Sequence, residues 1–443
     1  MRRDYLLLLG AAAGALLVLV SNPASVSFVR RPAQAVAAEG RPALELFREV
    51  YQLAHERYVT SPDDSKLIEG AIKGLMRGLD PHSEYLDAQT FRTIQEEAQG
   101  AFGGLGLQVT MENGLVKVVA PVANSHAAKA GLRSGDLIVR LDGVPVRGLT
   151  INQAIERIRG PVDSTIRLTI QRKDQPEPTD VSVVRDLIRV QTVFSRTIGG
   201  DVGYIRIAKF NDLTAVGLRK ALEDISTRTP ANRLRGFILD LRNNPGGVLE
   251  QAILVSSAFL KSGDIVTTRG RNPEDNRRFT AAATSNDLGK GRPLIVLING
   301  GSASAAEIVA GALQDRKRAT VLGSRSFGKG SVQSTSSIGG GGALKLTTAF
   351  YYTPGGHSIQ AKGITPDIEV MQEGREAQQL RAAIDSEATL RNHLGGDGEE
   401  QTGSEGYVPS DSKDDKAMKM AIDLLRGAKS HPAFPANRTS THN

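Results

Sequence analysis

The sequence predicts a multidomain α/β protein, because the spacing of its apolar residues changes twice along 443 residues. From Arg41 to about Gln99, apolar residues recur every three or four positions, which is typical of helices. From Ala101, short stretches of alternating residues indicate the strands of a small β domain. From Asp201, strands alternate with helices, and this order predicts a mostly parallel sheet.

These changes divide the chain into five regions. They are an N-terminal segment (1–39), a helical region (40–100), a small β domain (101–187), an α/β core (188–370) and a helical C-terminal region with a polar linker and tail (371–443). In the last region we expect a helix from Gln372 to Leu394, a disordered stretch over Gly395–Lys413 and a final helix over Lys416–Ala428.

Runs of apolar residues place the individual elements of the two central regions. In the small β domain, the predicted strands are Val116–Val119, Leu137–Leu141 and Ile166–Ile170, and one helix covers Thr150–Ile158. In the α/β core, the predicted strand–helix pairs are Val202–Ile207 with Asp212–Thr227, Gly236–Leu241 with Val248–Leu260, and Leu294–Ile298 with Ala303–Asp315.

Composition excludes several classes of protein. With 40% hydrophobic and 23% charged residues, the chain is not disordered throughout. It has no Cys, which excludes a disulfide scaffold, a thiolate metal site and a cysteine nucleophile. The net charge of +7 (55 − 48) is spread along the chain, so we expect no nucleic-acid partner. No cluster of His, Asp and Glu has metal-ligand spacing, so we expect no metal or cofactor.

The N-terminus has the pattern of an export signal. Met1-Arg2-Arg3-Asp4 precedes an uncharged apolar run from Tyr5 to Val20. The small-residue sites at Ala33–Ala37 lie well beyond that run, so an uncleaved membrane anchor is the alternative to a cleaved signal peptide. Either outcome predicts the periplasm or cell envelope, with anchoring to the inner membrane in the second case.

Three segments of the α/β core have the residue types of a hydrolytic site. Leu239–Gly247 ends a buried strand in adjacent glycines, whose N–H groups can stabilise an oxyanion, although an ordinary strand–helix turn has the same pattern. Asn299–Ile308 also follows a buried strand, and either Ser302 or Ser304 could cap the helix that begins there. Ser326–Gln333 places a lysine between two glycines at the start of a strand.

A Ser–Lys pair explains these segments together. A serine hydroxyl is a weak nucleophile until a base takes its proton, and a buried lysine with a lowered pKa can act as that base. A His-based triad is harder to build, because His357 is the only histidine of the α/β core and His82 fits capping or packing in a turn. Gly323–Lys329 matches part of a phosphate-binding loop, but Gly330 stands where Ser or Thr is needed and a strand follows instead of a helix.

These motifs, in this order, resemble those of the carboxyl-terminal processing (tail-specific) serine proteases, peptidase family S41, from about Leu44 to Val370. The motifs are D-P-H-S-x-Y at 80–85, G-L-G-L at 104–107, L-R-N-N-P-G-G at 241–247, S-A-S-A-A-E-I at 302–308 and F-G-K-G at 327–330. The resemblance implies a ClpP/crotonase-like fold for the α/β core and serine-type endopeptidase activity.

The resemblance also implies roles for single residues. Ser304 corresponds to the nucleophile, Lys329 to the base, and Gln333 to the residue that orients the lysine amine. The oxyanion donors correspond to the N–H of Ala305 and one N–H from Gly246 and Gly247. Asp315 occupies a position implicated in some relatives, and we expect it to cap or pack at the helix end.

The small β domain resembles a PDZ domain, which binds an extended peptide C-terminus as an added strand. By this resemblance, the backbone N–H groups of Leu105, Gly106 and Leu107 take the terminal carboxylate. Leu107, Val109 and either Ile155 or Ile158 then form an apolar pocket for the last side chain.

The sequence therefore predicts an exported serine endopeptidase that binds protein tails and cleaves near them with a Ser–Lys dyad. The expected partners are proteins with apolar C-terminal tails, an adaptor protein and further copies of the chain in a homo-oligomer. The alternatives are a catalytically inactive PDZ scaffold that binds peptides and a nucleotide-dependent enzyme that uses Gly323–Lys329.

Overall fold

The computed structural model describes residues 41–281, 286–373 and 386–434, and the chain divides into two compact units, residues 1–71 and 72–443. The first unit contains α2 (Arg41–Arg57) and the start of α3 (Asp64–Arg77). The apolar stripe of α2 is exposed, with Leu44 at 70% and Val50 at 56% of their full accessibility. The predicted N-terminal signal or anchor lies outside the described residues. Within the part of the chain that the structure describes, no helix has the length and apolarity needed to cross a membrane.

The small β domain is a six-stranded antiparallel sheet with two short helices, α5 and α6. Its sheet has the order β3-β4-β5-β7-β8, with β6 (Val144–Pro145) paired to β5 and β3 at one edge. The bounds are β3 Leu107–Glu112, β4 Leu115–Pro121, β5 Leu137–Leu141, β7 Thr165–Gln171 and β8 Thr179–Val184, with α5 at His126–Lys129 and α6 at Ile151–Ile158. A two-stranded ribbon of β2 (Ala101–Gly104) and β9 (Asp186–Arg189) joins the domain to its neighbours in sequence. The short helix α5 was not predicted.

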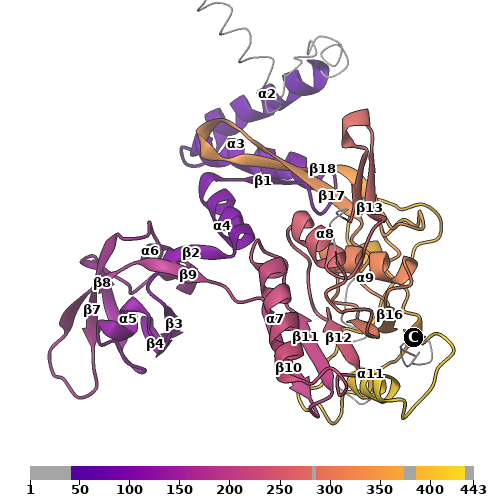
Figure 1. Cartoon of the computed structure of the whole chain (residues 1–443). Coiled ribbons are helices and arrows are strands. Elements are labelled where there is room, and N and C mark those ends of the chain that lie inside the picture. The colour runs from indigo at the N-terminus through magenta and orange to yellow at the C-terminus, as the bar shows by residue number, and fades with distance from the viewer. Residues whose placement is uncertain (1–40, 282–285, 374–385, 435–443) are drawn as a thin grey trace, which may run out of the picture. The chain divides into compact units, whose positions relative to one another are not determined.

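The α/β core contains the predicted parallel sheet. Its order is β10-β11-β12-β15-β16-β19, and only β10 runs antiparallel to its neighbour. The strands are β10 Val193–Ile198, β11 Val202–Ile207, β12 Gly236–Asp240, β15 Leu294–Ile298, β16 Thr320–Gly323 and β19 Ile368–Glu369. Apolar side chains point to both faces, as buried parallel strands require. Helices α7 (Thr214–Arg228), α8 (Leu249–Ser257) and α9 (Ala305–Asp315) cover one face, and α11 (Lys416–Arg426) covers the other (Figure 1).

A second, antiparallel sheet was predicted only in part. It joins β1 (Glu84–Leu86), β18 (Ala343–Tyr352), β13 (Asp264–Gly270) and β14 (Arg277–Thr280), and β17 (Ser331–Ser337) pairs with β18. Of these strands, the sequence analysis predicted only β17. α4 (Ala88–Gln99) precedes the small β domain and ends at Gly100, which adopts a positive φ of 68° as a left-handed cap.

One expectation for the C-terminal region is wrong, and a second falls largely outside the described residues. Gly395–Lys413 is not disordered, because its polar backbone is bound to the core: the Glu405 carbonyl accepts hydrogen bonds from Gly300 N (2.7 Å) and Ser324 Oγ (2.7 Å). The predicted helix over Gln372–Leu394 lies partly outside the described residues, and beyond that gap only the single 3-10 turn η3 (Glu387–Thr389) forms. Composition suggested disorder over Gly395–Lys413, but this stretch has specific partners in the core.

The L-R-N-N-P-G-G motif anchors α11 through a buried ion triad. Arg242 is 5% exposed and its guanidinium donates to both carboxylate oxygens of Asp240, at 2.9 and 2.7 Å. It also donates to Asp415 (2.9 Å), the N-cap residue of α11. The arginine therefore joins the end of β12 to the start of the helix that covers that face of the sheet.

We predict that Arg242→Ala destabilises the fold strongly, because it leaves two buried carboxylates without their cation. The expected loss is about 3–5 kcal/mol in free energy of unfolding, measured by urea denaturation. Arg278→Ala is the control, because Arg278 pairs with Asp264 at a side-chain exposure of 70%, and we expect a much smaller loss there because water screens the pair. Equal losses in the two variants would contradict the anchoring role.

Candidate active site

The structure distinguishes the two serines of the S-A-S-A-A-E-I motif. Ser302 is fully buried, and its hydroxyl donates to Leu241 O (2.8 Å) and accepts from Asn299 N (3.0 Å). Ser302 therefore ties the β15–α9 turn to the end of β12. Ser304 is half-buried and lines a cavity. Its side chain faces the backbone N–H of Glu307 in a capping box, and its hydroxyl donates to no acceptor among the described residues. Of the two hydroxyls, only that of Ser304 is available to react.

Ser304 has a strained backbone. Its φ of 54° and ψ of −114° lie in a region that residues with a side chain rarely adopt. The residue occupies the N-cap position of α9, at the end of the turn that follows β15. Strain of this kind costs about 1–3 kcal/mol and persists where the surrounding structure enforces it. Here the conformation presents the side chain at the sharp turn between strand and helix.

Glu307 holds the nucleophile and the lysine segment together. Its side chain is fully buried and accepts four hydrogen bonds. Oε2 accepts from the backbone N–H of Ser304 (2.7 Å) and of Lys329 (2.9 Å), and Oε1 accepts from Ser326 Oγ (2.6 Å) and Gly328 N (2.7 Å). Burial raises its pKa to about 7, against the opposing effect of these hydrogen bonds. Sequence reasoning quoted this glutamate within its motif but gave it no role.

Lys329 lies on the same cavity as Ser304 and has a lowered pKa, as a general base requires. It lies between two glycines before β17. Burial lowers the pKa of its ammonium group, and the positive charge of Lys345 lowers it further, while the carboxylates of Glu387, Glu307 and Asp80 act in the other direction. The Glu307 carboxylate binds the backbone of Lys329, and no hydrogen bond or ion pair of the Lys329 amine is found in the described residues.

The glycine turn after β12 offers one oxyanion donor. The N–H of Gly246 is already bound to Asn244 Oδ1 (2.9 Å), so Gly246 does not serve. The N–H groups of Gly247 and Ala305 have no acceptor in the described structure. Gly246 instead allows close approach, because a Cβ there would lie 2.8 Å from Ser304 Cβ and 3.0 Å from Ala305 N. Of the two predicted glycines, the geometry therefore favours Gly247 as the partner of Ala305.

Gln333 lies on β17 in the wall of the same cavity. Its amide nitrogen donates to Ser331 Oγ (3.0 Å) and Thr347 Oγ1 (3.2 Å), which fixes one end of the amide. No hydrogen bond of its amide oxygen is found within the described ranges.

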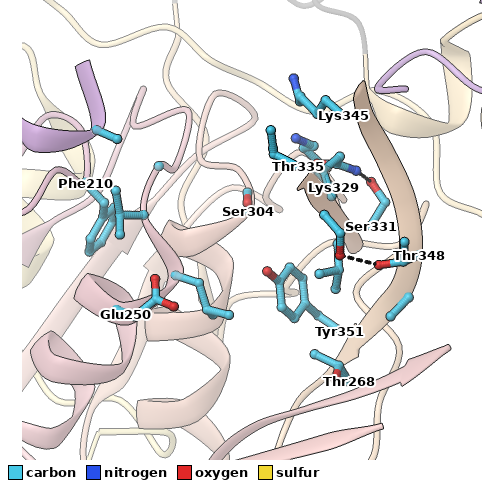
Figure 2. A pocket seen from close by; sticks show the side chains of 18 of the residues that line it. Phe210, Glu250, Thr268, Ser304, Lys329, Ser331, Thr335, Lys345, Thr348 and Tyr351 are labelled. Carbon is cyan, nitrogen blue, oxygen red and sulfur yellow. Dashed lines mark hydrogen bonds between the residues drawn. The ribbon is translucent and has the colours of Figure 1, made fainter. Parts of the chain in front are cut away.

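The cavity has a volume of about 510 Å³. Figure 2 shows Ser304 and Lys329 on its wall, together with Phe210 and Tyr351. Apolar side chains supply much of the remaining lining: Val248, Leu249, Phe279, Val332 and Ala349. The arrangement can hold an extended chain against a serine hydroxyl, a lysine with a lowered pKa and two free backbone N–H donors.

The small β domain has an unpaired sheet edge where a peptide could add as a strand. Strand β3 pairs only with β4, so its other edge is free within the described sheet. The N–H groups of Leu105 and Gly106, just before β3, have no acceptor in this part of the structure. Leu107, Val109 and Ile155 are half-buried, whereas Ile158 is 6% exposed and belongs to the domain interior. The structure therefore favours Ile155 over Ile158 for the pocket.

Three other sequence features have structural roles. Asp315 accepts a hydrogen bond from Gly355 N (2.7 Å) at the end of α9 and does not line the cavity. His82 Nε2 contacts the buried carboxylate of Glu387 at 2.8 Å. Gly323–Lys329 leads into β17 and not into a helix, so it lacks the helix N-terminus that a phosphate-binding loop uses.

Comparisons with known proteins identify the family. Residues 201–370 match the model of peptidase family S41, residues 117–172 match a PDZ domain, and residues 9–90 match the N-terminal domain of the activating protease CtpB. The chain is 49% identical over 394 residues to a carboxy-terminal-processing protease of Bartonella bacilliformis, covering 88% of this chain and 90% of that one.

It is 33% identical over 365 residues to the carboxy-terminal processing protease CtpA of Bacillus subtilis, covering 82% and 75% of the two chains. The solved structure of the photosystem II D1 C-terminal processing protease is 27% identical and covers 75% of this chain and 87% of its own, with a TM-score of 0.43. Fold and matches together define a serine protease with a PDZ domain, which confirms the predicted multidomain α/β class. The chain belongs to the carboxy-terminal processing proteases of peptidase family S41.

We predict that Glu307→Gln disrupts the site, because an amide NH2 would face two of the four hydrogen-bond donors. A buried donor left without an acceptor costs about 1–3 kcal/mol, so we expect a lower melting temperature and a loss of peptidase activity. Glu112→Gln, in a half-buried surface pair with Lys117, is the control. Wild-type activity in Glu307→Gln would show that the carboxylate does not organise the site.

Lys345→Met tests the pKa of Lys329. Removing the positive charge of Lys345 removes one cause of the lowered pKa, so the pKa of Lys329 should rise. Because only the neutral amine accepts a proton, the acid limb of the kcat/KM profile should move to higher pH. Lys117→Met, in the small β domain, should leave the profile unchanged. A shift to lower pH in Lys345→Met would exclude Lys329 as the titrating base.

Proposed function

We propose that the chain is a serine endopeptidase that cleaves with a dyad of Ser304 and Lys329. The observation that supports this most is the buried carboxylate of Glu307, which binds the backbone of both residues at one cavity. The hydroxyl of Ser304 and the amine of Lys329 lie on that cavity, and neither donates a hydrogen bond to another group of the described protein.

In the proposed reaction, Ser304 Oγ attacks the carbonyl carbon of the scissile bond while the neutral Lys329 amine takes the hydroxyl proton. The oxyanion accepts hydrogen bonds from Ala305 N and Gly247 N. Lys329 then gives its proton to the leaving amine, the C–N bond breaks and an ester to Ser304 remains. Water attacks that ester after losing a proton to Lys329, and the same proton returns to Ser304 Oγ as the acid product leaves.

The second part of the proposal concerns tail binding. A substrate C-terminus would pair with the free edge of β3, and its carboxylate would bind the N–H groups of Leu105, Gly106 and Leu107. Leu107, Val109 and Ile155 would contact the last side chain, which favours an apolar residue there. The carboxyl end of the substrate would thus be recognised apart from the site of cleavage.

We also propose export to the periplasm or cell envelope, with substrates and an adaptor protein in that compartment. The apolar run Tyr5–Val20 supports export. The exposed apolar stripe of α2 supports assembly into a homo-oligomer. The alternative, an inactive PDZ scaffold, has less support, because the Ser304, Lys329 and Gln333 set is intact.

The experiment is cleavage of a loosely folded reporter by the purified full-length chain. One reporter ends in an apolar tail and a second ends in two aspartates. We expect wild type to cut the apolar-tailed reporter faster, and we expect Ser304→Ala and Lys329→Ala to lose at least a thousandfold in kcat. Ser302→Ala separates the two serines: it should lose stability but retain the nucleophile. Full cleavage by folded Ser304→Ala would overturn the dyad.

A further inference from the structure

A chain of hydrogen bonds connects the D-P-H-S turn to Gln333. Asp80 is 4% exposed, and its Oδ1 accepts the hydroxyl of Thr347 (3.0 Å), while Thr347 Oγ1 accepts the amide nitrogen of Gln333 (3.2 Å). Ser83 also links Asp80 to Thr347, because its hydroxyl donates to Asp80 Oδ2 (2.5 Å) and accepts from Thr347 N (3.0 Å). Residues far apart in sequence, in the turn before β1, in β18 and in β17, therefore share one network.

Local backbone geometry makes this contact possible. Strands β17 and β18 pair antiparallel, with Val332 opposite Ala349, but Gln333 lies opposite Thr347 and not Thr348. The extra residue on β18 is a β-bulge, a feature that changes which side chains face each other. The bulge thus sets Gln333 against Thr347, the residue that Asp80 binds.

The direction of the donors fixes the orientation of the amide. Burial acts to raise the pKa of Asp80, but the hydrogen bonds from Ser83, His82 and Thr347 outweigh it and keep the pKa below its usual value. Asp80 is therefore ionised and can only accept. Its bond to Thr347 uses the single proton of that hydroxyl, so Thr347 can only accept from Gln333. The NH2 group of Gln333 must then face Thr347, which leaves the amide oxygen free for the cavity.

We propose that Asp80 and Thr347 are positioning residues that hold Gln333 with its amide oxygen toward the Lys329 amine. The inference rests on the proposed function, because it assigns the amide oxygen to the lysine of that dyad. Thr347 does not line the cavity, so it acts through Gln333 and not on the substrate. Without it, the amide can rotate and present its NH2 group to Lys329.

The main test is Thr347→Val, which removes the hydroxyl and keeps the β-branched shape. We expect kcat to fall about tenfold, the equivalent of one hydrogen bond, with KM unchanged. An NH2 group facing the ammonium disfavours its charged form, so the acid limb of the kcat profile should move to lower pH. The charged groups around Lys329 are Lys345, Glu387, Glu307 and Asp80. The substitution removes none of these charges, and Asp80 keeps its hydrogen bonds from Ser83 and His82 when the bond from Thr347 is lost. Thr347→Ser, which restores the hydroxyl, should restore both kcat and the profile.

A double-mutant comparison separates positioning from general stability. If Thr347 acts through Gln333, adding Thr347→Val to Gln333→Ala should change kcat less than twofold. Thr169→Val is the matched control, since Thr169 Oγ1 donates to Asp180 (2.6 Å) on a strand of the small β domain, and it should keep wild-type kcat.

The outcomes distinguish the two proposals. Wild-type kcat in Thr347→Val, beside inactive Ser304→Ala and Lys329→Ala, would overturn the positioning role alone. A full tenfold loss in the Gln333→Ala background would overturn it as well, because the effect would then bypass Gln333. Activity in Lys329→Ala would overturn the proposed dyad and the positioning role together.

Discussion

The Glu307 carboxylate is the interaction on which the site depends. A buried carboxylate is costly unless hydrogen bonds replace its water shell, and this one receives four. Two of the four come from the backbone of the residues proposed as nucleophile and base. The relative position of Ser304 and Lys329 is therefore fixed by their main chains, and their side chains need no bond to each other to stay in place. The same contact helps to enforce the rare backbone angles of Ser304.

Two sheets of different kinds supply the parts. The parallel sheet brings Ser304 and the Gly246–Gly247 turn together, because both follow the carboxyl ends of neighbouring strands, β15 and β12. The antiparallel sheet supplies Gln333 and the wall beyond it, and Lys329 lies at its margin. Glu307 and Ser302 join these parts, the first toward β17 and the second toward β12. Each bond crosses between segments that are distant in sequence, so the site exists only in the complete fold.

The sequence predicted what depends on local pattern. Buried parallel strands have long apolar runs, so Gly236–Asp240 and Leu294–Ile298 were found almost to the residue. The glycine turns and the lysine between glycines were also predicted, because each is a short contiguous motif. The partners of Glu307, the bulge opposite Gln333 and the order of β13, β17 and β18 depend on pairing across the chain, which periodicity does not record. Composition also misled over Gly395–Lys413. This polar, glycine-rich stretch was predicted to be disordered, although the carbonyl of Glu405 within it accepts a hydrogen bond from the core.

The use of backbone donors also explains how a lysine can serve beside a carboxylate. An ion pair between Glu307 and the Lys329 amine would favour the ammonium and raise its pKa, which would make it a poor base. In this structure both oxygens of Glu307 are occupied by backbone N–H groups and the Ser326 hydroxyl, so the carboxylate has no free oxygen for the amine. Its charge still acts on the lysine at a distance, but burial and Lys345 oppose it, and the pKa of Lys329 falls. The carboxylate can thus position the base without an ion pair to its ammonium group, because the bond that it makes to Lys329 goes to the main chain.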